Sequence, residues 1–187
     1  MNTLHWTTQI DQITADFQRS FGGLTKEELN RQPHPGRWSI AQNMDHLIVV
    51  SSTYFPVIDA IRKGTYKLPF TGKLNFMVSF FGKLILSSVQ PGTKRKTKTF
   101  TVWEPGQSKI ESDILDRFVR HQEELKKLIE RSADLLENKT VISSPANRNV
   151  VYRLDTAFDI IVAHERRHLQ QAKDLLSSGQ ALSAPSP

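Results

Sequence analysis

Two histidines stand four residues apart in the segment His164-Glu165-Arg166-Arg167-His168. In a helix this spacing places both imidazoles one turn apart on one face, where they can reach a single ion. His168 lies about 20° and His164 about 60° around that helix from Ile161, so the pair belongs to its apolar, core-facing side. Buried imidazoles need polar partners, and a shared metal ion would be one. Two hydrogen-bonded core histidines are the alternative.

The same five residues match the motif of zincin proteases, in which the glutamate acts as general base. We disfavour that interpretation, because no His or Glu follows His168 and Asp174 alone is acidic beyond it. A third ligand must therefore come from upstream. His46 is the best candidate, and His121 is a rival ligand or a residue that supports one. Either could instead be an ordinary structural histidine.

Helical periodicity predicts two long helices in the first third of the chain. The first covers residues 7–21. The second begins at Ser39, which forms a capping-box pattern with Gln42, and it carries His46 two turns later. We expect Pro56 to kink this second helix and Gly64 to end it.

Two more long helices are predicted in the second half of the chain. One begins at Ser108, with Glu111 completing a capping-box pattern, and ends near residue 131. Its apolar face includes His121. The last helix runs from about Asp155 to Gly179 and carries the histidine pair. Residues 138–153 are predicted to be a connection.

The region between the second and third long helices is less regular. Residues 72–89 form either a helix or strand-like pieces; the helix would turn inward Phe76, Phe80, Leu84 and Ile85. A long loop follows, and it contains the basic run Lys94-Arg95-Lys96 with Lys98. Four amphipathic helices with little strand signal predict an all-α bundle with a long insertion between helices two and three.

The bulk composition sets further limits. The 187 residues carry a net charge of +6, which admits an anionic partner such as nucleic acid or phospholipid, although a solvated loop at residues 94–98 explains much of the excess. There is no cysteine, which excludes a thiolate site. We expect no signal peptide, no membrane span and a cytoplasmic location.

Two segments together resemble the DinB-like superfamily. Residues 36–47, Gly-Arg-Trp-Ser-Ile-Ala-Gln-Asn-Met-Asp-His-Leu, are similar to its second-helix motif, and residues 164–171, His-Glu-Arg-Arg-His-Leu-Gln-Gln, to its fourth-helix motif. The resemblance implies an up-down-down-up four-helix bundle, with one domain over residues 1–178. It also implies a homodimer and a divalent metal ion held by His46, His164 and His168. The small and Pro-rich composition of residues 179–187 predicts a disordered tail.

The resemblance implies chemistry on a small molecule, because members are assigned as metal-dependent hydrolases or as transferases using low-molecular-weight thiols. Three neutral nitrogen ligands leave a coordination position open, so the ion could activate either water or a thiol. Zinc or nickel is expected, with manganese or iron as alternatives. A metal-binding protein without catalysis is the competing hypothesis, and nucleic-acid binding through residues 94–98 is a weaker one.

Four residues near the expected ligands are candidates to orient a ligand or touch substrate. Glu165 and Asp45 adjoin ligands in sequence, but each lies about 100° around its helix from the neighbouring His, so we expect surface carboxylates there. Gln171 lies one turn beyond His168 and could touch substrate or make a polar interhelix contact. His121 is the fourth.

Overall fold

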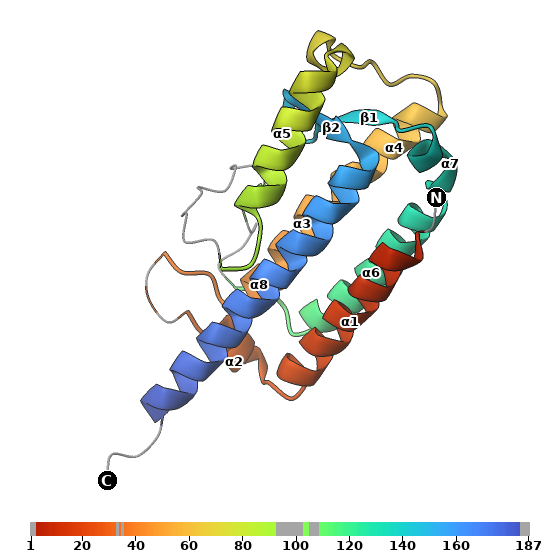
Figure 1. The fold of residues 1–187 in the computed structure, drawn as a ribbon. Coiled ribbons are helices and arrows are strands. Elements are labelled where there is room, and N and C mark those ends of the chain that lie inside the picture. The colour runs from red at the N-terminus through yellow and green to blue at the C-terminus, as the bar shows by residue number, and fades with distance from the viewer. Residues whose placement is uncertain (1–2, 33, 35, 93–102, 105–108, 184–187) are drawn as a thin grey trace.

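A computed structural model describes residues 3–32, 34, 36–92, 103–104 and 109–183 (Figure 1). The elements, in chain order, are α1 (Leu4–Phe21), α2 (Lys26–Asn30), α3 (Ile40–Ser52), α4 (Tyr54–Arg62), the short 3-10 helix η1 (Phe70–Lys73), α5 (Asn75–Ser88), α6 (Ile114–Glu130), α7 (Ala133–Glu137), β1 (Val141–Ser144), β2 (Asn147–Arg153) and α8 (Leu154–Ser183).

The long helices α1, α3, α6 and α8 form a four-helix bundle. Helix α1 packs against α6 and α8, and α3 packs against the same two helices from the other side. Figure 1 shows α1 and α8 running in one direction and α3 and α6 in the other, which is the predicted up-down-down-up order. Because α3 and α6 are parallel, the chain must return along the bundle between them. The insertion that carries η1 and α5 provides this return.

The second long helix begins where the sequence predicts and is broken near its proline. The Ser39 hydroxyl accepts from the Gln42 amide at 3.1 Å, and the Gln42 side chain accepts from the Ser39 amide at 3.0 Å. Helix α3 ends at Ser52 and α4 begins at Tyr54. Pro56 has no N–H to donate to the Ser52 carbonyl, and its ring would crowd that carbonyl, so a continuous helix is disfavoured.

The predicted start of the third long helix is wrong. Helix α6 begins at Ile114, and Ser108, the expected cap, lies outside the described residues. The Asn30 side chain donates to the Ile110 carbonyl at 2.8 Å and accepts from the Ile110 amide at 2.7 Å. Lys26 pairs with Glu111 at 2.6 Å. The Ile110 amide and carbonyl are thus bonded to α2 and are not available for the hydrogen bonds of a helix that begins earlier. The basic run at 94–98 also lies outside the described residues.

Residues predicted as a plain connection contain a β-hairpin. Strands β1 and β2 pair antiparallel, with Ile142 opposite Tyr152, and both side chains are buried. Helix α8 follows β2 directly and continues to Ser183, past the predicted end at Gly179. Residues 179–183 of the expected tail are therefore helical, and 184–187 lie outside the described residues. In the part of the chain that the structure describes, the fold is a helical bundle with one small two-stranded sheet.

Residues 75–88 form a helix, but three of the four side chains expected to face inward point outward. Phe76, Phe80 and Leu84 are 67%, 58% and 43% exposed, whereas Val78 and Gly82 are buried. A Cβ on Gly82 would lie 3.2 Å from a Thr156 methyl carbon and 3.5 Å from the Tyr152 Cβ. The side of α5 that carries Gly82 therefore packs closely on α8 and β2. Ile85 is partly buried against the core as expected, whereas Phe76, Phe80 and Leu84 point outward.

Aromatic side chains fill much of the bundle interior. Phe17 of α1 lies 4.6 Å from Phe118 of α6 between ring centroids, and Trp6 contacts Phe158 of α8 at 5.5 Å. Phe17, Phe118 and Phe158 are fully buried. Among the described residues, no helix combines the length and the apolar character that crossing a bilayer requires.

Candidate metal centre

Three histidines from two helices of the bundle meet at one point. His46 lies on α3, and His164 and His168 lie one turn apart on α8. The Nε2 atoms of His164 and His168 are 3.0 Å apart, and those of His46 and His164 are 3.4 Å apart. His46 and His168 are buried and His164 is partly exposed.

Hydrogen bonds outside the cluster fix which nitrogen of two rings faces inward. Nδ1 of His46 is 2.6 Å from the Trp103 carbonyl oxygen, which can only accept, so this nitrogen carries the proton. Nδ1 of His168 is 2.7 Å from Oδ1 of Asn43, and the Asn43 amide donates to the Ser39 carbonyl. In both rings Nε2 is therefore unprotonated, and its lone pair points toward the other histidines of the cluster.

This arrangement fits a cation better than a hydrogen-bond network. A proton on His164 Nε2 could satisfy only one of the two facing lone pairs, whereas a cation satisfies all three nitrogens. Zinc–nitrogen bonds of about 2.0–2.1 Å in tetrahedral geometry imply nitrogen separations of roughly 3.3 Å, close to the two observed here. The donor set therefore suits a divalent ion with an open coordination position.

Electrostatics keep the three imidazoles neutral, as metal ligation requires. Burial lowers the pKa of His46, against the opposite effects of the Trp103 carbonyl and the Asp45 carboxylate. Burial, with the neighbouring His46 and Arg167, lowers the pKa of His164 to about 3. Burial likewise holds the pKa of His168 well below its ordinary value. None of the three side chains is anionic, so an ion here would keep its full positive charge.

The rival histidine lies elsewhere. His121 of α6 is buried, its Nε2 is 2.6 Å from the Ser51 hydroxyl, and its ring packs 5.7 Å from that of Phe55. It does not belong to the cluster of His46, His164 and His168. His121 therefore joins α6 to α3 as a structural polar contact.

The two flanking carboxylates are buried rather than exposed, contrary to our expectation. Asp45 is 8% exposed and accepts from Arg117 of α6 at 3.3 Å. Glu165 is 1% exposed and accepts from the Gln122 amide of α6 at 2.9 Å, and burial raises its pKa to about 8. Both point toward α6 because residues next to a ligand lie about 100° away around the helix. Gln171 is exposed on α8.

Sequence reasoning missed the residues that support the ligands. Asn43 stands three positions before His46, on the same side of α3, so its helical spacing was a usable signal. The Trp38 ring packs 4.6 Å from the ring of His46 and 5.9 Å from that of His168, giving the cluster an aromatic wall. The Trp103 carbonyl lies 57 positions along the chain from His46, and no local pattern predicts it.

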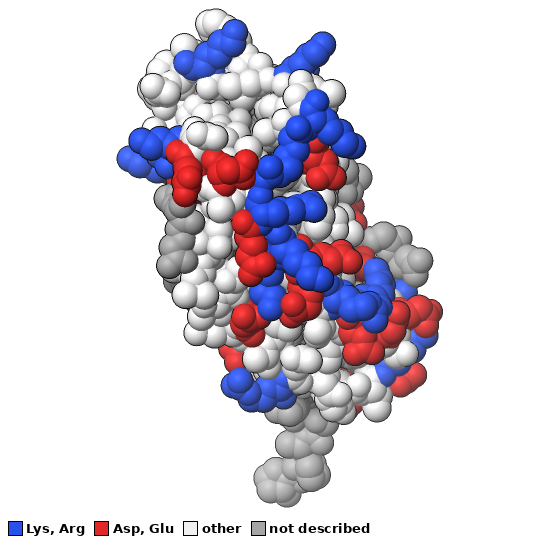
Figure 2. Space-filling view, turned by 90° about the vertical axis from the view of Figure 1, so that its right-hand side faces the viewer, with Lys and Arg blue, Asp and Glu red and all other residues white. Residues whose placement is uncertain are grey.

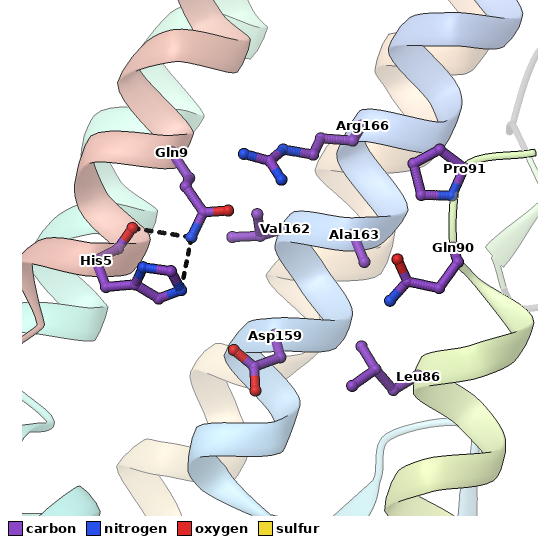
Figure 3. Close-up of a pocket in the computed structure, with 9 residues that line it drawn as sticks. All are labelled: His5, Gln9, Leu86, Gln90, Pro91, Asp159, Val162, Ala163 and Arg166. Carbon is purple, nitrogen blue, oxygen red and sulfur yellow. Dashed lines mark hydrogen bonds between the residues drawn. The ribbon is translucent and has the colours of Figure 1, made fainter.

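A separate pocket of about 270 Å³ lies on the other side of α8 (Figure 3). Asp159 and Arg166 of α8 line it, and Figure 3 shows His5 and Gln9 of α1 hydrogen-bonded to each other at its edge, with Nε2 atoms 2.9 Å apart. One Asp159 oxygen accepts from the Trp6 indole at 2.7 Å. The helix itself separates this pocket from the histidines, so it is not the metal centre.

The bundle topology and the buried cluster define a class of four-helix proteins with a three-histidine site. The DinB superfamily model matches residues 9–172, most of the chain, and the protein belongs to this superfamily. In structure it is similar to YfiT from Bacillus subtilis, described as a probable metal-dependent hydrolase with an unusual four-helix bundle topology. That likeness has a TM-score of 0.53 at 15% identity and covers 95% of this chain and 87% of YfiT. Among curated proteins no match is found.

Proposed function

We propose that this protein is a metal-dependent enzyme acting on a small molecule, with His46, His164 and His168 holding a divalent ion. The observation that carries the proposal is the convergence of three Nε2 atoms, two of them fixed as lone pairs by bonds at Nδ1. Zinc or nickel is the proposed ion, with manganese or iron as alternatives. Such an ion lowers the pKa of bound water to about 7 or holds a thiol as its thiolate.

The chain's own residues would position the reactants. His46 and His168 are held rigidly by the Trp103 carbonyl and by Asn43, and the Trp38 ring limits access from their side. Reactants would enter beside the partly exposed His164. Since no carboxylate joins the cluster, its charge would favour an anionic group at the open position, such as hydroxide or thiolate.

Hydrolysis and thiol transfer are the two reactions we propose for this site. The description of YfiT as a probable metal-dependent hydrolase supports the first. The resemblance of the two histidine motifs to families of thiol transferases supports the second, and it also suggests a homodimer. A screen of simple esters and amides without thiol, and of electrophiles with several thiols, separates the two reactions. Turnover that needs no thiol would contradict transfer.

Both reactions require a bound metal ion, so the metal content of the purified protein is the first test. We expect a metal ion in the purified protein and its loss from a His164→Ala/His168→Ala variant. The matched control is His5→Ala/His34→Ala, which removes two exposed histidines and should keep the ion. Equal metal content in the first variant and in the wild type would refute the site. A non-catalytic metal protein would bind the ion and show no turnover in either screen.

A further inference from the structure

One face of α5 carries large apolar side chains that no packing accounts for. Phe76, Phe80 and Leu84 follow each other at four-residue steps and form one outward stripe, and Phe70 of η1 is 72% exposed. These are four of the five large exposed apolar residues in the described chain. In Figure 1, α5 lies at the edge of the molecule, outside the four long helices, with β2 and α8 packed on its inner side.

The chain segment that carries this stripe has charges of a single sign. No Asp or Glu occurs between Asp59 and Glu104 in the sequence. Lys83 lies on the outward side of α5 between Phe80 and Leu84, and Lys73 ends η1. Both lysines are exposed, and neither forms an ion pair within the described part of the chain.

The opposite side of the bundle carries charged side chains of both signs. Figure 2 shows Lys and Arg mixed with Asp and Glu over the face that α1 and α6 form. Ion pairs occur there, such as Lys126 with Asp11 at 2.6 Å. The basic and apolar character of the α5 side is thus a local property and not that of the whole surface.

We propose that this face, defined by Phe70, Phe76, Phe80 and Leu84 with Lys73 and Lys83, docks on an anionic phospholipid surface. Aromatic and aliphatic side chains of an amphipathic helix enter the headgroup boundary of a bilayer, while lysines reach lipid phosphates. A second copy of the chain fits less well. A two-fold interface would bring equal lysine-bearing faces together, the segment that forms this face has no carboxylate to pair them, and interface cores are depleted in lysine.

The docking requires no membrane-spanning helix and does not depend on the metal centre. Helix α5 would lie flat on the surface with its inner side still packed on the bundle. Because the C-terminal end of α5 is tied to α8 by the bond from Arg167 to the Ser88 carbonyl, at 2.5 Å, the helix would dock without leaving the fold.

Vesicle co-sedimentation of the full chain tests the proposal. We expect binding to vesicles of phosphatidylcholine with phosphatidylserine, weakening with salt, and none to phosphatidylcholine alone. Phe76→Ser/Phe80→Ser and Lys73→Glu/Lys83→Glu should each reduce binding at least tenfold. These side chains are exposed, so both variants should fold, which circular dichroism and unfolding curves verify.

Two controls match these changes elsewhere on the surface. Leu4→Ser removes an exposed apolar side chain of α1, and Arg120→Glu/Lys127→Glu makes the same charge change on α6. Both controls should bind as the wild type does. No vesicle binding by the wild type, or equal losses in the α6 and α5 charge variants, would overturn the proposal. A dimer that Phe76→Ser/Phe80→Ser dissociates, without vesicle binding, would show instead that this face joins two copies.

Discussion

Substitution of Asn43 gives the sharpest test of how the fold sets the orientation and the protonated nitrogen of the histidine rings. The Oδ1 atom of Asn43 accepts from Nδ1 of His168 at 2.7 Å, and the residue is 2% exposed. In Asn43→Ala the His168 ring can rotate, or carry its proton on Nε2, which then no longer points a lone pair at the cluster. Loss of a hydrogen-bonded partner behind a ligand typically weakens metal binding about 10–100-fold. We expect the upper part of this range, because the bond is short and buried; 100-fold corresponds to about 2.7 kcal/mol.

The same substitution also affects stability, which has to be separated from metal binding. Asn43 additionally donates to the Ser39 carbonyl at 2.8 Å, so Asn43→Ala loses two buried hydrogen bonds, at about 1 kcal/mol each. Thr14→Ala is a suitable control, because its hydroxyl donates to the Ile10 carbonyl at 2.7 Å, within α1 and away from the cluster. It should lower stability without changing metal affinity.

Zinc affinity is best measured by competition with a chromophoric chelator at neutral pH. Asn43→Asp keeps an acceptor for His168 Nδ1 and should bind zinc nearly as the wild type does, whereas Asn43→Ala should not. The reasoning is refuted if folded Asn43→Ala binds zinc with wild-type affinity. It is equally refuted if Asn43→Asp and Asn43→Ala weaken binding to the same extent.

Two further predictions concern buried polar contacts. The hydroxyls of Tyr54 and Tyr152 are 2.9 Å apart in the core, so Tyr54→Phe should lower the free energy of unfolding by about 1–3 kcal/mol in urea titrations. The double Tyr54→Phe/Tyr152→Phe variant should lose less than the two single losses together, and simple additivity would contradict the coupling. Burial lowers the pKa of His121, so its contribution to stability is present above the unfolded-state pKa of about 6.5 and is lost as the pH falls below it. The stability difference between wild type and His121→Gln should therefore shrink on acidification, and a constant difference across that range would argue against it.

The helices that carry His46, His164 and His168 could be predicted from the sequence because the patterns that indicate them are local. The four-residue spacing of His164 and His168 and the cap at Ser39 each depend on neighbours within one helical turn. Support for the ligands was harder to predict, since the Trp103 carbonyl reaches His46 from 57 positions away. Glu165 was expected at the surface because charged helix residues usually are, but the Gln122 side chain of a distant helix gives it a buried partner.

The prediction of which side of α5 is buried was wrong for a different reason. Apolar residues lie on all sides of this helix, so periodicity does not identify a buried face. Close packing decides it, because Gly82 allows α5 to approach Thr156 and Tyr152, which the larger side chains of the other face would prevent. The β-hairpin was missed because its strands are short and the apolar pattern extends over few residues.

The packing of α8 against α3 has a consequence for the order of events during folding. It places His46 and His164 in contact although they are 118 positions apart, and contacts between such distant positions carry a large loop-closure cost. The ligand set is incomplete until α8 has been made and has docked between α1 and α3. A partly synthesised chain that ends after α3 therefore holds only His46 of the three proposed ligands. Capture of the proposed ion would therefore mark the finished fold, and the ion would then stabilise that fold by mass action.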